Sequence, residues 1–107
     1  MARLLPWEQL QETAKEALNV VDPPARITAG SGSVKGNGDV ISPRFMCECK
    51  LRSKKNITVD VDHWRKLCDE AELMDRIPLQ ICENEDGEVI VSLRLNQLVE
   101  VINAYRS

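Results

Sequence analysis

Three charged residues near the middle of the chain have types and a spacing that could support chemistry: Asp39, Glu48 and Lys50. Glu48 and Lys50 lie two residues apart in an otherwise apolar run, so on a strand both would project from one face. Burying an acid and an amine there is costly unless they are paired or bind a metal ion. An ordinary Glu48–Lys50 ion pair on an edge strand is the simpler interpretation. A hairpin could also bring Asp39 close to Glu48.

Two carboxylates held together favour a hard divalent cation. Mg²⁺ prefers oxygen ligands and commonly takes one or two carboxylates, several waters and substrate phosphate. Such an ion polarises a phosphate and lowers the pKa of a bound water. Lys50 could orient or deprotonate that water and stabilise charge in the transition state. Asp39 and Glu48 are therefore the candidate ligands for Mg²⁺ or Mn²⁺, and hydrolysis of a phosphodiester is the chemistry these residues could perform.

The pattern of apolar residues predicts the elements that must position this site. Residues 7–21 form an amphipathic stripe typical of a helix, made by Trp7, Leu10, Ala14, Ala17, Leu18 and Val21. A second helix is predicted from about 62 to 75, capped by Asp60 or Asp62, and a third from about Asn96. Extended segments are predicted at residues 26–29, 39–41, 45–51, 57–59, 77–82 and 89–93. This order predicts a single α/β domain, residues 1–107, with helices packed on a mixed sheet.

The charge distribution favours a nucleic-acid partner more than the net charge of −3 does. Residues 35–55 contain six basic and two acidic residues, a net charge of +4, and the remainder of the chain carries −7. Such a local patch can hold a phosphate backbone, although a charged solvated loop is the alternative for Arg52, Lys54 and Lys55. Ser31, Ser33 and Lys35, in the predicted glycine-rich loop 30–38, could also contact phosphates.

Composition narrows the class of protein. The balance of 43% hydrophobic and 29% charged residues is that of a globular domain, and no apolar run approaches the roughly 20 residues that span a bilayer. The N-terminal residues do not resemble a signal peptide, so a cytoplasmic location is expected. Cys47, Cys49, Cys68 and Cys82 are expected to be reduced and buried. A zinc site using them and His63, or a small redox or metal-storage protein, is the alternative, but CxxC spacing is absent from the sequence.

The residues above resemble a known motif. Gly38-Asp39-Val40 followed by Glu48-Cys49-Lys50 resembles the PD-(D/E)xK nuclease motif, with Gly38 in place of its proline. Within that superfamily the chain is most similar to the archaeal and phage Holliday-junction resolvases, through Arg26, Ser31-Gly32-Ser33, Asp39 and Glu48-x-Lys50. The resemblance implies a restriction-endonuclease-like core and a Mg²⁺-dependent endonuclease that cuts branched DNA. It also implies a homodimer, because a two-fold pair of sites could cut two strands symmetrically.

One feature of the family has no clear match. These nucleases usually add an acidic residue from the first helix, yet Glu8, Glu12 and Glu16 lie away from the apolar stripe. Gln11 lies nearer, so Gln11 or Glu12 is the candidate for this position. Two alternatives therefore stay open: a DNA-binding module that keeps the fold without cleavage, and a nicking or restriction-type nuclease.

Overall fold

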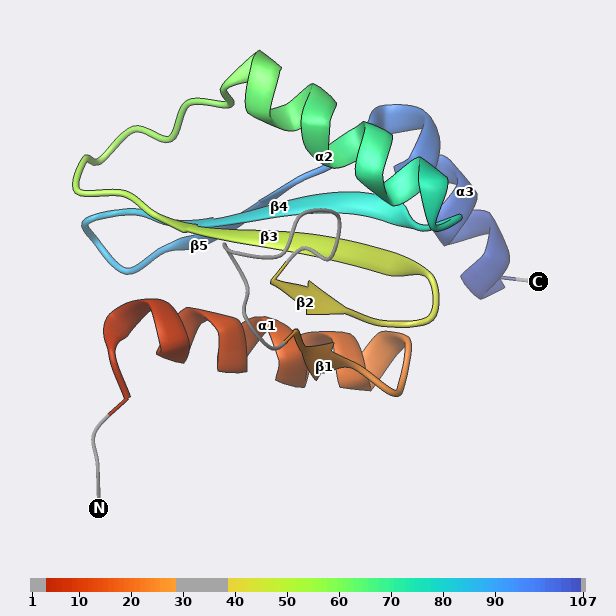
Figure 1. The fold of residues 1–107 in the computed structure, drawn as a ribbon, viewed down its shortest axis with the longest axis horizontal. Coiled ribbons are helices and arrows are strands. Elements are labelled where there is room, and N and C mark those ends of the chain that lie inside the picture. The colour runs from red at the N-terminus through yellow and green to blue at the C-terminus, as the bar shows by residue number, and fades with distance from the viewer. Residues whose placement is uncertain (1–3, 29–38, 107) are drawn as a thin grey trace.

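The computed structural model describes residues 4–28 and 39–106, and within them five strands form one mixed sheet flanked by helices (Figure 1). The elements follow one another as α1 (Pro6–Val21), β1 (Arg26–Ile27), β2 (Val40–Ile41), β3 (Phe45–Leu51), α2 (Val61–Leu73), β4 (Ile77–Glu83), β5 (Val89–Ser92) and α3 (Leu95–Arg106). The strands lie in sequence order, β1-β2-β3-β4-β5. Only the β3–β4 pair is parallel among these described strands, because α2 carries the chain back between them.

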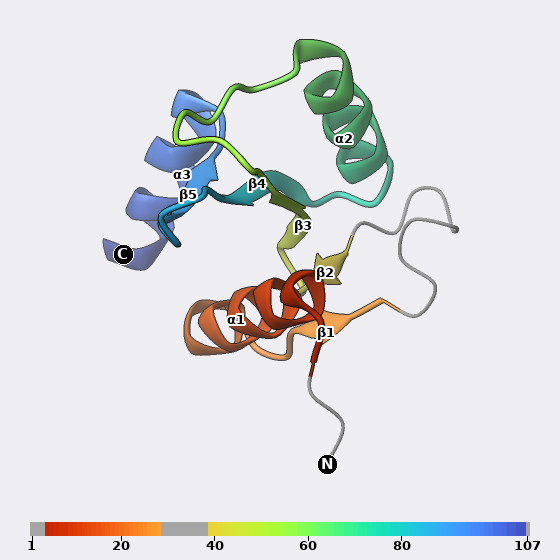
Figure 2. The ribbon, with the colours of Figure 1, turned by 90° about the vertical axis from the view of Figure 1, so that its left-hand side faces the viewer.

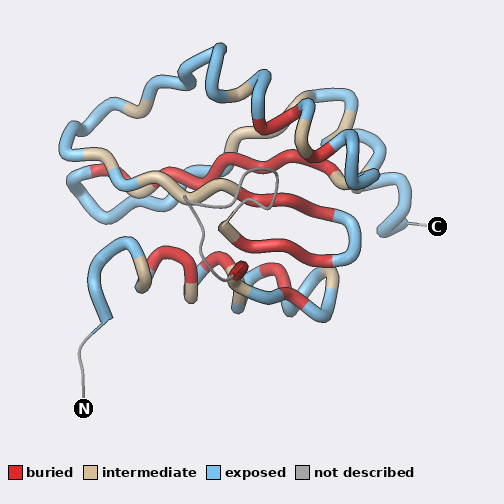
Figure 3. The backbone as a smooth tube through the Cα atoms, in the orientation of Figure 1, coloured by how far each residue is buried: buried red, intermediate tan, exposed pale blue. Residues whose placement is uncertain are grey.

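The two faces of the sheet are covered by different helices (Figure 2). Leu10, Ala14 and Leu18 of α1 pack with Phe45 and Cys47 of β3 in one core cluster. On the other face, Leu67 and Ala71 of α2 pack with Ile41 and Met46, and Trp64 joins them at the margin. Odd-numbered residues of β3 therefore face α1 and even-numbered residues face α2, as strand alternation predicts. The buried residues follow β2, the first half of β3, β4 and the middle of α1 (Figure 3).

Helix α1 begins as predicted but buries a narrower stripe. Pro6 occupies the first turn, and the Leu5 N–H donates to Glu8 Oε1 at 2.9 Å. Gln11 is buried beside the apolar residues, whereas Trp7 and Val21 are 49% and 68% exposed. Trp7 and Val21 belong to the first and last turns, while Leu10 to Leu18 occupy the turns that cover the sheet. Trp7, Ala17 and Val21, which belong to the predicted apolar stripe, are therefore exposed.

The remaining elements follow the predicted pattern with one exception. Asp60 caps α2, because its Oδ1 accepts from the N–H groups of Asp62 and His63 at 3.0 and 3.2 Å. The Asp86-Gly87 pair turns the β4–β5 hairpin, with Gly87 at φ +80°. Residues 57–59, predicted to be extended, belong to the long connection between β3 and α2 and to no strand. No helix within residues 4–28 and 39–106 combines the length and apolarity needed to cross a bilayer.

Asp22 ties the end of α1 to the turn between β2 and β3. Its Oδ2 accepts from Ser42 Oγ and from the Arg44 N–H, each at 2.7 Å, and Ser42 is only 3% exposed. We expect Asp22→Ala to lower the free energy of unfolding by about 2 kcal/mol, because it leaves a buried hydroxyl unpaired. Urea unfolding measures this, with Asp22→Asn as the milder control because its amide oxygen can still accept. A loss below about 0.5 kcal/mol for Asp22→Ala would mean that these bonds contribute little net stability.

Candidate active site

Two hydrogen bonds hold Asp39 against β3, one made by its backbone N–H and one by its side-chain carboxylate. Its N–H donates to Cys47 O at 2.8 Å, and its Oδ2 accepts from the Cys49 N–H at 2.7 Å. Val40 is the register partner of Cys47, so Asp39 and Val40 both oppose that one residue, which is the arrangement of a β-bulge. The Asp39 carbonyl in turn accepts from the Thr28 N–H at 3.0 Å. The carboxylate thus takes the place of a backbone acceptor beside the segment that carries Glu48 and Lys50.

Glu48 and Lys50 form a partly buried pair. Lys50 Nζ lies 3.4 Å from Glu48 Oε1, and the side chains are 29% and 25% exposed, respectively. Glu48 Oε1 is itself buried and makes no hydrogen bond among the described residues, so its polar interaction there is the ion pair with Lys50. The pair lies on β3, the third strand of five, which rules out the predicted alternative of an ion pair on an edge strand. A half-buried, incompletely satisfied pair is more costly than an ordinary surface pair.

Arg26 shares a face of the sheet with these residues. It pairs with Ile41, which packs against α2, and the neighbouring Thr28 hydrogen-bonds to Asp39. Arg26 is exposed and lies two residues before Thr28 on the strand next to β2. Arg26, Glu48 and Lys50 therefore lie on one face of the sheet, and the Asp39 carboxylate reaches the same stretch of β3 through the Cys49 N–H. The predicted contacts Ser31, Ser33 and Lys35 lie outside the described residues.

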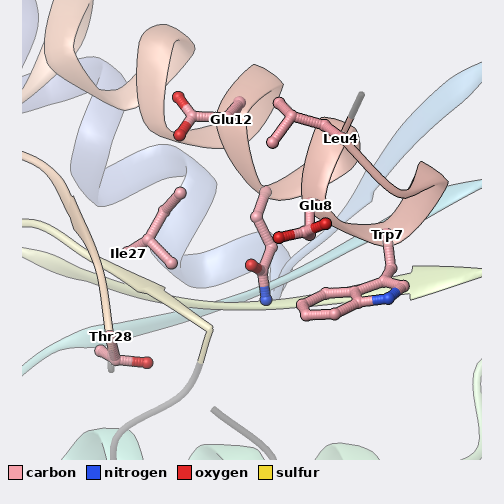
Figure 4. A pocket seen from close by; sticks show the side chains of 7 residues that line it. Leu4, Trp7, Glu8, Glu12, Ile27 and Thr28 are labelled. Atoms are coloured by element: carbon pink, nitrogen blue, oxygen red, sulfur yellow. The ribbon is translucent and has the colours of Figure 1, made fainter. Parts of the chain in front are cut away.

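The first-helix candidates Gln11 and Glu12 line a pocket of about 300 Å³ next to β1 (Figure 4). Thr28 lines the same pocket, and its N–H donates to Asp39 O. Thr28 therefore connects the pocket to Asp39. Gln11 is 6% exposed, whereas Glu12 is more open and its Oε2 lies 3.1 Å from Lys15 Nζ. Gln11 is thus the more buried of the two, but α1 packs on the face of the sheet opposite to the one that Glu48 and Lys50 share. Trp7, a member of the predicted apolar stripe, forms part of the pocket wall.

The basic segment Arg52–Lys55 is held by backbone hydrogen bonds to the β4–β5 hairpin. The Arg52 N–H donates to Glu83 O at 2.9 Å, and Lys54 O accepts from the Glu85 N–H at 3.1 Å. Asn84 donates from Nδ2 to Lys55 O at 3.1 Å, while its Oδ1 accepts from Asp86 and Glu88 N–H groups. The segment is therefore an ordered part of the fold. The hairpin that holds it carries Glu83, Glu85, Asp86 and Glu88, a neighbourhood that the sequence alone did not reveal.

The cysteines are free and mostly buried, as expected. Burial raises the pKa of Cys49 to about 12, and the nearby Asp39 carboxylate adds to this. Burial likewise raises the pKa of Cys47. Thiols in such an environment stay protonated at neutral pH and are poor metal ligands. His63 is exposed, and in the part of the chain that is described no three His, Cys, Asp or Glu side chains are grouped to hold a metal ion.

Gln80 was not among the predicted site residues, although it is the register partner of Glu48 on β4. It is 1% exposed and is the one polar residue in the run Ile77–Cys82. That isolated polar residue in a buried strand was the signal that could have marked it. Its partner strand, however, could not be known from the sequence.

Comparison by sequence finds no matching family model and no matching curated protein. Comparison by structure finds Hjc from Archaeoglobus fulgidus, described as a Holliday junction resolvase from an archaeal hyperthermophile. The match covers 79% of this chain and 73% of that chain, with a TM-score of 0.64 and 14% sequence identity. The predicted fold is thereby confirmed: this chain has the mixed α/β, restriction-endonuclease-like fold of an archaeal Holliday-junction resolvase.

Proposed function

We propose that this protein is a metal-dependent endonuclease that cuts branched DNA, with four-way junctions as its substrate and residues 1–107 as one nuclease domain. The observation that carries the proposal is the Asp39 carboxylate, held by the Cys49 N–H at 2.7 Å beside the partly buried Glu48–Lys50 pair. This arrangement occurs on the fold of a Holliday junction resolvase. Fold alone does not determine function, so the proposal depends on these three side chains.

The residues fit a hard divalent cation. Glu48 Oε1 is buried and makes no hydrogen bond within the described residues, and its neighbour Lys50 Nζ, at 3.4 Å, leaves it room to bind a cation. Asp39 and Glu48 would hold Mg²⁺ or Mn²⁺, and two carboxylates suffice when waters and a substrate phosphate supply the other ligands. When bound, the ion supplies Lewis-acid stabilisation and a more acidic water. Lys50 lies within reach of the same carboxylate and would hold the attacking water or offset charge on the phosphate.

Arg26 and the loop basic residues would position the DNA through its phosphates. We expect joint replacement of Arg52, Lys54 and Lys55 by glutamine to weaken binding to all DNA substrates. Each lost phosphate contact should lower the slope of log K against log salt by about 0.9. Joint replacement of Glu85 and Glu88 by glutamine is the matched control, since it removes charge from the facing hairpin and should not lower the slope. An unchanged slope in the triple variant would mean that these residues do not contact phosphates and form a solvated loop.

A homodimer is part of the proposal, because a junction offers two symmetric strands to cut. Its support is the apolar surface on β5 and α3. Val89, Ile90 and Val91 of β5 are 43–49% exposed, although β5 is an edge strand of the described sheet. The structure describes every residue of α3, and none of them is buried. Leu95, Val99 and Ile102 of this helix are exposed. Edge strands and apolar patches of this kind are usually covered by a partner.

The proposal is tested by incubating the protein with labelled four-way, Y-shaped and linear duplex DNA, with and without Mg²⁺. We expect Mg²⁺-dependent paired nicks in the four-way junction and little cutting of the linear duplex. Equal cutting of linear duplex would favour a restriction-type nuclease instead. Binding of the junction without any cleavage would favour the binding module, which the buried Gln11 in place of an acid makes the second candidate.

A further inference from the structure

Gln80 is a polar residue buried in the middle of an apolar strand. It lies at the centre of β4, where every residue from Ile77 to Cys82 is buried, and its side chain is 1% exposed. Its Oε1 finds no hydrogen-bond partner in the residues that the structure describes. Leaving a buried acceptor unsatisfied destabilises a fold, so an apolar residue would suit this strand better unless the oxygen has a ligand.

The position of Gln80 points to what that ligand is. Glu48 and Gln80 are register partners on the parallel strands β3 and β4, and paired residues on neighbouring strands, about 4.8 Å apart, project from the same face. Glu48 Oε1 is also buried and makes no hydrogen bond within the described chain, although Lys50 Nζ lies 3.4 Å from it. Two buried oxygen atoms that make no hydrogen bond to the described residues therefore belong to neighbouring residues on the face that carries Glu48 and Lys50.

We propose that the amide oxygen of Gln80 is a third protein oxygen of the cation site, acting on the metal ion or on a water bound to it. This inference rests on the proposed metal site of Asp39 and Glu48. Side-chain amide oxygens are hard ligands, as carboxylates are. A neutral amide adds an oxygen without adding a third negative charge next to two carboxylates. Gln80 would therefore raise affinity for a divalent cation at a cost to the stability of the metal-free protein.

The test measures metal binding and metal-free stability together, in the full chain. Calorimetric titration with Mn²⁺ gives the affinity, and urea unfolding in EDTA gives the stability. We expect Gln80→Leu to be at least as stable as the parent in EDTA but to bind Mn²⁺ about tenfold more weakly, the lower end of losses seen when groups around a metal are removed. Gln80→Glu should bind Mn²⁺ at least as tightly as the parent while being less stable in EDTA.

Gln97→Leu is the matched control. Gln97 lies on α3, and its Oε1 is likewise buried without a hydrogen-bond partner in the described residues. Gln97 thus has the same kind of unsatisfied amide oxygen as Gln80 but belongs to a different element from Asp39 and Glu48. Its removal should leave Mn²⁺ affinity unchanged.

The outcomes separate the inference from the function on which it rests. Unchanged Mn²⁺ affinity in Gln80→Leu, with affinity lost in Asp39→Asn, would overturn the role of Gln80 and keep the metal site. Full affinity in Asp39→Asn would overturn the metal site and the role of Gln80 with it. If Gln80→Leu does not fold, Gln80→Glu decides: affinity equal to or above that of the parent supports the inference, and reduced affinity overturns it.

Discussion

Asp39→Asn and Glu48→Gln are each expected to abolish cleavage of four-way junctions while leaving junction binding within about twofold of the parent, because phosphate contacts rather than the metal ligands set most of the affinity. The Asp39→Asn change is especially informative. An asparagine oxygen can still accept from the Cys49 N–H, so the 2.7 Å contact that fixes the side chain can persist while the ligand charge is lost. Single-turnover cleavage at saturating protein and a mobility-shift assay without Mg²⁺ measure the two properties.

Glu85→Gln is the control for both substitutions. Glu85 is exposed on the hairpin, so the change removes one negative charge without touching the candidate site. It should cut junctions at the parental rate. Full activity in Asp39→Asn or in Glu48→Gln would exclude that carboxylate as an essential metal ligand.

The site residues could be predicted because their geometry is local. Glu48 and Lys50 share a face through strand alternation alone, and the bounds predicted for β3 match the observed Phe45–Leu51. Asp39 approaches β3 because only a short turn, Ser42 to Arg44, separates β2 from β3. The bulge at Asp39 is held by hydrogen bonds to β3 and to Thr28, the residue after β1, and no local sequence pattern indicates these contacts.

Features that depend on distant parts of the chain could not be predicted in this way. Gln80 meets Glu48 because the crossover through α2 sets the parallel register of β4 on β3. Asn84 reads as an ordinary turn residue, yet it holds Lys55, which is 29 positions away. Trp7 shares the helical phase of the core stripe, but whether it is buried depends on where the sheet ends beneath α1. Residues 57–59 have strand-forming side chains without a strand to pair with.

Lys50→Ala is expected to separate the chemical role of the lysine from that of the carboxylates. An ammonium group carries no lone pair for Mg²⁺, so the variant should bind Mn²⁺ and junction DNA as the parent does. The cleavage rate should fall by roughly 10²-fold or more, the usual loss when one electrostatic or acid–base group is removed. Lys50→Arg should not restore the rate fully, because arginine keeps the charge but has a wider planar head and cannot accept a proton.

Single-turnover cleavage and Mn²⁺ calorimetry on the same Lys50→Ala preparation decide between three roles. Lys66→Ala, at an exposed lysine of α2, is the control for loss of a positive charge. A low rate with intact Mn²⁺ binding supports a role for Lys50 in the chemical step. A parental rate would make the 3.4 Å contact with Glu48 an ordinary ion pair. Loss of both metal and activity would mean that Lys50 acts as a positioning residue, because its charge offsets the repulsion between the carboxylates that bind the cation.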